Sequence, residues 1–276
     1  MGHTLPQFVI IGSQKAGTTT LYEVLRDHPQ IFMPQKKELN FFFAQAEFDQ
    51  GLSHYARYFA PAPEGALRGE ASPGYICHPK VAARLHNALP EAKLILTVRN
   101  PIDRAYSQYW DNRRQLSEFR SWAKVIEEDC FTPYQPGRKG YMARGTYATY
   151  LNTWRALFGE DRIHIVVVDD LKADPKGTLA DIYEFLGVDP EQGASPNRRA
   201  NPAAVYTNPL YRALFAQPKL SGRLPGVIRA LARRGEQRPW RYPPMSAAER
   251  ARLLAFFKPH NAALEAILDR KLGWDR

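Results

Sequence analysis

The stretch from Gly12 to Thr20 contains the residue types of a phosphate cradle. Its members are two glycines, one lysine and three consecutive hydroxyls: Gly12, Gly17, Lys15, Thr18, Thr19 and Thr20. Glycines allow a tight turn, so that backbone N–H groups and the start of a following helix can point at one anion. In the ATP/GTP pattern G-x-x-x-x-G-K-[ST], a lysine stands where this chain has Thr18. We therefore expect a site for a phosphate-like group rather than ordinary nucleotide hydrolysis; an incidental glycine turn is the alternative.

A second candidate is the segment 36–43, in which charged residues precede three phenylalanines. It follows an apolar run, Ile31 to Met33, that predicts a short strand. In open α/β sheets the carboxyl ends of the strands form the ligand crevice, which would bring Glu38 to the edge that carries Lys15. A carboxylate there could act as a general base. In the simpler alternative, the phenylalanines fill the core and the charged side chains stay in water.

Arg99 is the third candidate, because it ends the apolar run that begins at Lys93. Pro101 suits the first turn of a new helix, and Ser107 lies about two turns into it. The forked guanidinium of an arginine can hold two phosphate oxygens at once. Arg99 is thus a candidate anion clamp, unless it pairs with Asp103.

These residues require a scaffold of alternating strands and helices. Apolar runs predict strands at 8–11, 31–33, 93–99 and 163–168, and more weakly within 67–75. Helices are expected at 79–89, from 101 onward, at 147–158 and around 179–186, and a last helix after Ser246, a residue suited to an N-cap. The alternation predicts an α/β fold with a P-loop-like central parallel sheet, helices on both faces, and a single domain over residues 1–276.

Composition limits the remaining possibilities. The 276 residues are 44% hydrophobic, enough for a full core, and no apolar run is long enough for a membrane span. Two cysteines and no N-x-[ST] acceptor favour a cytoplasmic protein. The formal charge of +10 is compatible with nucleic acid, an acidic membrane or a polyanionic cofactor. The basic stretch 219–241, which includes an amphipathic piece near Val227, Ile228 and Leu231, could contact an anionic membrane surface transiently.

The order of the motifs resembles that of the PAPS-dependent sulfotransferases, and most closely the heparan sulfate sulfotransferase-like group with its soluble bacterial members. Gln14–Thr20 is similar to the family's loop for the 5′-phosphosulfate, and Lys37–Phe42 to its K/N-E-x-H-F-F element. Arg99–Ser107 is similar to its 3′-phosphate element, Asn197–Pro202 to its late cofactor loop, and Phe257–Trp274 to its closing helix. The likeness runs from about Phe8 to Trp274, and residues 205–245, a candidate cap over the substrate, match least.

The resemblance implies a sulfuryl transfer from PAPS to a hydroxyl, with PAP as the product and without a metal ion. Glu38 would be the general base, and Lys15 would act on the leaving group. The residues implied in cofactor binding are Lys15, Ala16, Gly17, Thr18, Thr19, Thr20, Arg99, Ser107, Arg198 and Arg199. Those implied in contact with the acceptor are Lys37, Asn40, Glu70 and Tyr75.

This chain departs from the family pattern at several positions. Glu70-Ala71-Ser72 stands where many animal members have E-K-[ST], and Asn40 stands where histidine is frequent. The acceptor is therefore left as a carbohydrate, a glycolipid or another small metabolite, and no nucleic acid partner is expected. Two other functions stay open at this point. One is a P-loop kinase or NTPase, with Asp169 as a magnesium ligand, and the other is a non-catalytic basic protein that binds nucleic acid or anionic lipid through Arg223–Arg241.

Overall fold

The computed structural model describes residues 5–130, 132–193, 204–216 and 224–275. Their contacts group them into two compact units. The first unit comprises residues up to 99, residues 134–136, and the stretch from 147 to 200. The second comprises residues 100–133, 137–146 and 201–276. Of the predicted site residues, Arg198 and Arg199 lie outside the described residues.

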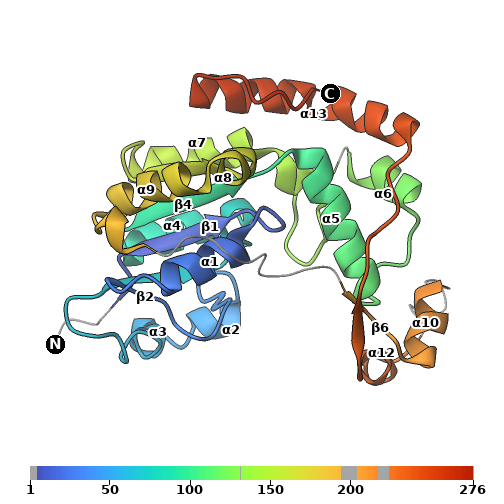
Figure 1. Cartoon of the computed structure of the whole chain (residues 1–276), viewed down its shortest axis with the longest axis horizontal. Coiled ribbons are helices and arrows are strands. Elements are labelled where there is room, and N and C mark those ends of the chain that lie inside the picture. Colours follow the sequence, from blue (N-terminus) through green and yellow to red (C-terminus); the bar gives the residue numbers. More distant parts are fainter. Residues whose placement is uncertain (1–4, 131, 194–203, 217–223, 276) are drawn as a thin grey trace. The chain divides into compact units, whose positions relative to one another are not determined.

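The first unit is built around a five-stranded sheet in the order β2-β3-β1-β4-β5, and every neighbouring pair is parallel. This arrangement confirms the predicted α/β fold with a central parallel sheet (Figure 1). Its strands are β1 (Phe8–Gly12), β2 (Ile31–Phe32), β3 (Leu67–Ala71), β4 (Lys93–Val98) and β5 (Ile163–Val167). Its helices are α1 (Thr18–Arg26), α2 (Gln45–Phe48), α3 (Leu52–Ala56), η1 (Tyr75–Cys77), α4 (Val81–Ala88), α7 (Tyr147–Phe158), α8 (Val168–Ala173), α9 (Pro175–Leu186) and η3 (Pro190–Gln192).

Helices cover both faces of this sheet. On one face, α1 and α9 pack against Phe8 and Ile10 of β1 and against the neighbouring strands. On the other face η1 lies under Leu96 of β4, and Trp154 of α7 donates to the carbonyl of Ile76 (3.0 Å). The central strands β1 and β4 are consequently buried on both sides, which explains why their sequences are mainly apolar rather than alternating.

One glycine determines how closely β3 approaches β1. Gly69 pairs with Phe8 in the ladder, and the Phe8 ring covers the position that a side chain at 69 would occupy. A Cβ atom built on Gly69 would lie 2.1 Å from the ring. No side chain fits there unless the ring moves.

The second unit is mainly helical. It contains α5 (Pro101–Arg114), α6 (Trp122–Asp129), η2 (Ala143–Gly145), β6 (Ala204–Tyr206), α10 (Pro209–Ala216), α12 (Gly226–Ala232), β7 (Gln237–Pro239) and α13 (Ala247–Leu268). Side chains of α5, α6 and α13 form one buried cluster, which includes Ile102, Trp122 and Phe257. Strands β6 and β7 form a small antiparallel ribbon.

Local signals account for several boundaries. Asn100 caps α5 by accepting from Ile102 N–H (3.0 Å), and Pro101 occupies the first turn as predicted. Ser246 caps α13 in a capping box with Glu249. The helix at 147–158 is confirmed at both ends, whereas Val168, expected in a strand, begins α8. Within the described ranges, no helix is both long and apolar enough to cross a bilayer.

Candidate functional site

The loop between β1 and α1 presents an open helix start. Gly17, the N-cap of α1, adopts a left-handed conformation (φ 81°), and no side chain caps the first turn. The first N–H groups of a helix have no acceptor within the helix, so these amides can receive an anion. Ser13, in the same loop, has a buried hydroxyl oxygen for which the described residues provide no hydrogen-bond partner. An uncapped helix start beside an unsatisfied hydroxyl fits a phosphate-like group.

The end of β4 supports this loop. Ser13 N–H donates to the carbonyl of Thr97 (2.9 Å), and Thr97 Oγ1 donates to the carbonyl of Gly12 (3.0 Å). Arg99 Nη1 donates to the carbonyl of Lys15 (3.3 Å), so the structure brings two of the predicted cofactor residues together. The backbone of Arg99 is held in turn by the hydroxyl of Tyr147, which donates to its carbonyl (2.8 Å).

Lys37 connects this loop to Glu38. Lys37 Nζ donates to Thr19 Oγ1 on α1 (3.3 Å) and lies 3.4 Å from Glu38 Oε1. The Glu38 side chain is 39% exposed, so its carboxylate is accessible to a substrate. The second strand end and the first βα loop therefore meet at one edge of the sheet, as the sequence predicts.

Glu70, at the end of β3, is the centre of a buried polar network. Its Oε1 accepts from Tyr55 OH (2.9 Å) and its Oε2 from Ser72 Oγ (2.8 Å). Ser72 Oγ accepts from Asn40 N–H (3.0 Å), and Tyr75 OH accepts from Phe42 N–H (3.3 Å). Glu70 is 1% exposed and Tyr75 is fully buried. Both were predicted to contact the acceptor, but in this structure they face the interior.

Burial dominates the electrostatics of this carboxyl group. Desolvation raises the pKa of Glu70 from 4.5 to about 7, although hydrogen bonds from Ser72, Tyr75 and Tyr55 oppose the change. The negative charge of Glu38 adds to the increase. Burial also raises the pKa of Tyr55 and of Tyr75. Near neutral pH, Glu70 thus exists as both the acid and the carboxylate.

The remaining candidates lie in both units, Ser107 and Asp103 in the second and Asp169 in the first. Ser107 lies on α5 and is half-buried. Asp103, the alternative partner of Arg99, instead pairs with Arg250 of α13 (2.7 Å). Asp169, which a kinase would need as a magnesium ligand, pairs with Lys172 (2.9 Å). Within the described part of the chain, no three His, Cys, Asp or Glu side chains are grouped so that they could hold a metal ion.

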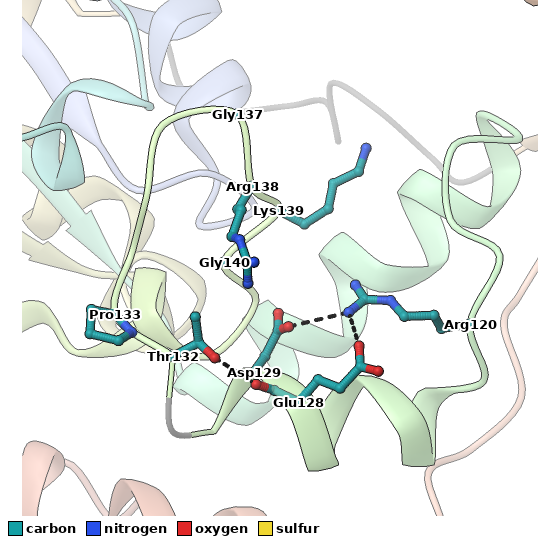
Figure 2. A pocket seen from close by; sticks show the side chains of 9 residues that line it. All are labelled: Arg120, Glu128, Asp129, Thr132, Pro133, Gly137, Arg138, Lys139 and Gly140. Atoms are coloured by element: carbon teal, nitrogen blue, oxygen red, sulfur yellow. Dashed lines mark hydrogen bonds and ion pairs between the residues drawn. The ribbon is translucent and has the colours of Figure 1, made fainter.

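The second unit contains a polar pocket of about 320 Å³ that the sequence did not predict. Figure 2 shows Arg120 directed at Glu128 and Asp129 in its wall, and the other lining residues are Thr132, Pro133, Gly137, Arg138, Lys139 and Gly140. Behind this wall, Arg120 donates to both oxygens of Glu118 (2.8 and 3.0 Å). The charges of Arg120, Glu128 and Asp129 in the wall are therefore already paired within the protein.

Sequence reasoning missed the residues that support the site from elsewhere in the chain. Tyr147 was predicted only as the start of the helix at 147–158, and neither Thr97 nor Tyr55 was singled out. A tyrosine hydroxyl carries no sequence signal for a partner 48 residues away, as between Tyr147 and Arg99. The sequence could have indicated Thr97, since it is the only hydroxyl residue in the apolar run of β4.

Comparison with known proteins identifies the family of this chain. The family profile described as a sulfotransferase domain matches residues 5–201. A crystal structure of a sulfotransferase from Alicyclobacillus acidocaldarius superposes with a TM-score of 0.73 at 26% identity, and covers 98% of this chain and 99% of that one. The chain therefore belongs to the sulfotransferase family.

Relatives of known sequence define the group within the family. Heparan sulfate glucosamine 3-O-sulfotransferase 6 of Mus musculus is 28% identical over 98% of this chain and 74% of its own length. Bifunctional heparan sulfate N-deacetylase/N-sulfotransferase 2 of Homo sapiens is 30% identical over 96% of this chain, which spans 30% of that enzyme. Membrane-associated sulfotransferase kil1 of Dictyostelium discoideum is 43% identical over 67% of this chain and 56% of its own length. The resemblance to PAPS-dependent enzymes of the heparan sulfate sulfotransferase-like group is thereby confirmed, and the NTPase and non-catalytic alternatives are set aside.

Proposed function

We propose that this sulfotransferase transfers the sulfuryl group of PAPS to a hydroxyl group, with Glu38 as the general base. The observation that carries the proposal is the Lys37 bridge, which joins Thr19 at the phosphate loop to the accessible Glu38 carboxylate. A general base must lie within hydrogen-bond reach of the proton that it removes, and Glu38 lies at the sheet edge that holds the loop.

The residues of the loop have separate roles in this proposal. The bound donor supplies a sulfuryl group on its 5′-phosphate. As the acceptor oxygen bonds to sulfur, the bond from sulfur to the phosphate oxygen breaks, the electron pair leaves with PAP, and the acceptor proton passes to Glu38. The first-turn amides of α1 and the Lys15 ammonium stabilise the charge that develops on the phosphate. Arg99, held beside Lys15, binds the second phosphate of the nucleotide.

For the acceptor we propose a carbohydrate hydroxyl, with a glycolipid or another small metabolite as the alternatives. The support is the relative from Mus musculus, a heparan sulfate glucosamine 3-O-sulfotransferase. The exposed face of Asn40 and the Lys37 ammonium would contact that acceptor. Independence from divalent metal remains a prediction.

We further propose a cytoplasmic enzyme that contacts anionic membranes transiently through α12 and its neighbours. Val227 and Leu231, one helical turn apart, are 66% and 45% exposed. Arg234, Arg238 and Arg241 nearby in the chain are also exposed. Apolar side chains flanked by arginines favour an acidic lipid surface. More of the protein should sediment with phosphatidylserine vesicles than with neutral vesicles, and Val227→Asp should lower the amount that sediments. Equal sedimentation with the two kinds of vesicle would rule the contact out.

The decisive experiment for the catalytic proposal is Glu38→Gln. Glutamine retains the size of the side chain but cannot accept the proton, so kcat should fall about 10²-fold or more while PAP affinity changes little. Lys15→Ala serves as the second arm and should lose turnover as well. Labelled PAPS with a panel of hydroxyl acceptors provides the assay, with and without EDTA. A normal kcat in Glu38→Gln would remove Glu38 from this role.

A further inference from the structure

The direction of one hydroxyl proton links Glu70 to the loop that carries Glu38. A serine hydroxyl has a single proton, and Ser72 gives that proton to Glu70 (2.8 Å). Its lone pairs are then left to accept Asn40 N–H (3.0 Å). Tyr75, whose hydroxyl lowers the pKa of Glu70, accepts Phe42 N–H (3.3 Å). The buried carboxylate thus orients the Ser72 hydroxyl as an acceptor toward the backbone of Asn40.

That stretch of backbone needs such support. Asn40 has a positive φ of 54°, a conformation that costs free energy for a residue other than glycine. Glu38, two residues earlier, is held only weakly through its own side chain: its ion pair within the described residues is the 3.4 Å contact with Lys37. The position of the Glu38 carboxylate therefore depends on the backbone that follows it.

The rings beside the network hold the same segment. Phe41 stacks on Tyr55 with centroids 4.5 Å apart, and Phe42 meets Tyr75 edge to face at 5.9 Å. Tyr55 packs against the segment and donates to Glu70 with its hydroxyl, whereas the Tyr75 hydroxyl accepts Phe42 N–H. Aromatic packing fixes where the segment lies, and the hydrogen bonds fix its backbone direction.

We propose that Glu70 is a positioning residue for the Glu38 loop, which it orients through Ser72, rather than a residue that touches the acceptor. The inference rests on the proposed role of Glu38. Because Glu70 is 1% exposed, it cannot reach a substrate hydroxyl in this structure. It also forms no ion pair with a described residue, and a buried carboxylate without a cation destabilises a fold. Such a group is retained at a functional site when it fixes geometry there.

The two bonds from hydroxyls to the same carboxylate supply a matched test. Ser72 leads to the loop backbone, whereas the Tyr55 hydroxyl leads only to Glu70. Ser72→Ala should lower kcat about tenfold, since a displacement of ~1 Å can cost as much as 10²-fold. Tyr55→Phe keeps the ring and should leave kcat within about twofold. PAP affinity should stay unchanged in both variants. Equal kcat in Ser72→Ala and wild type would overturn the proposal.

Glu70 itself is best tested in the Tyr55→Phe background, because Glu70→Leu then leaves no buried hydroxyl at position 55 without a hydrogen-bond partner. Glu70→Leu should again lower kcat about tenfold. Adding Ser72→Ala should lower kcat by less than the product of the two single losses, because both changes interrupt one path. Fully multiplicative losses would show that the residues act independently, and the proposal would fail.

Hydrogen exchange separates this inference from the assignment of the base. The Asn40 and Phe42 amides should exchange faster in Ser72→Ala and in the Glu70 variant, while amides of β1 and β4 keep their protection. Unchanged protection at Asn40 would overturn the positioning role whatever Glu38 does. If Glu38→Gln kept a normal kcat while Asn40 lost protection, the base assignment would fail and the positioning of the loop would still hold.

Discussion

Glu70 and Glu118 are two buried carboxylates with opposite electrostatics. Each accepts a hydrogen bond from a tyrosine, Tyr55 at 2.9 Å for Glu70 and Tyr141 at 2.7 Å for Glu118. Desolvation also raises the pKa of Glu118, but hydrogen bonds and charge from Arg120, with the Tyr141 bond, lower it to about 2. The pKa of Glu70 rises to about 7.

The main difference is the cation that faces Glu118. Glu118 is 5% exposed, similar to Glu70, yet it has the guanidinium of Arg120 across both its oxygens. Glu70 has only neutral hydroxyl donors and a negative neighbour in Glu38. A paired carboxylate stabilises the second unit near neutral pH, whereas an unpaired one destabilises the first and keeps a proton that can exchange.

The largest effect should come from removing the cation. Arg120→Met leaves Glu118 buried without a counter-charge, and breaking a buried pair costs about 3–5 kcal/mol. Because the Arg120 side chain is 31% exposed, we expect the lower end of that range. Urea unfolding followed by tryptophan fluorescence measures it, since Trp122 lies in the adjoining core. A free-energy loss below about 1 kcal/mol would mean that the pair is no stronger than a surface pair.

Glu118 should also determine acid stability. Its folded pKa of about 2 lies below the ordinary 4.5, so its contribution is complete above pH 4.5 and is lost as the pH falls toward 2. The loss should be on the order of 2–3 kcal/mol. Unfolding free energies between pH 6 and 3, compared with those of Glu118→Gln, test this. Parallel curves for the two proteins would contradict it.

Glu70 should produce the opposite trend and, at any one pH, the smallest effect. Its folded pKa of about 7 lies above 4.5, so its contribution is complete below pH 4.5 and is lost as the pH rises through 7. Glutamine cannot titrate, so the unfolding free energy of Glu70→Gln should vary less with pH between pH 5 and 8 than that of wild type. At pH 8 the variant should be at least as stable as wild type, with a gain of up to about 1 kcal/mol. A less stable Glu70→Gln at pH 8 would indicate that an unrecognised cation faces Glu70.

Local patterns in the sequence predicted most of the fold. The apolar runs of β1, β4 and β5 predicted strands. The glycines and threonines of Gly12–Thr20 predicted the loop, and a serine at position 246 predicted the helix cap. The missed helix α6 has a cap at Ser121 and an apolar pattern at Trp122, Val125 and Ile126, so the signal was present in the sequence.

Pairings between distant residues were beyond a single sequence. Glu118 meets Tyr141 across 23 residues, and Asp103 meets Arg250 across 147. The charges in a sequence do not specify which arginine pairs with a given carboxylate. Burial of Glu70 was equally hidden, because Arg68 and Gly69 beside it are not typical of a strand inside a sheet, whereas β3 lies between β2 and β1. Which carboxylates are exposed at the site depends on strand order.

The contact between Gly69 and Phe8 constrains how this family member can evolve. Since the ring occupies the volume of any side chain at 69, neither position can change freely by itself. A larger residue at 69 becomes tolerable only after the ring has been replaced by a smaller side chain, so the two sites should be substituted in a fixed order. The strand that ends in the phosphate loop and the strand that ends at Glu70 are thus tied in their substitution history as well as in space.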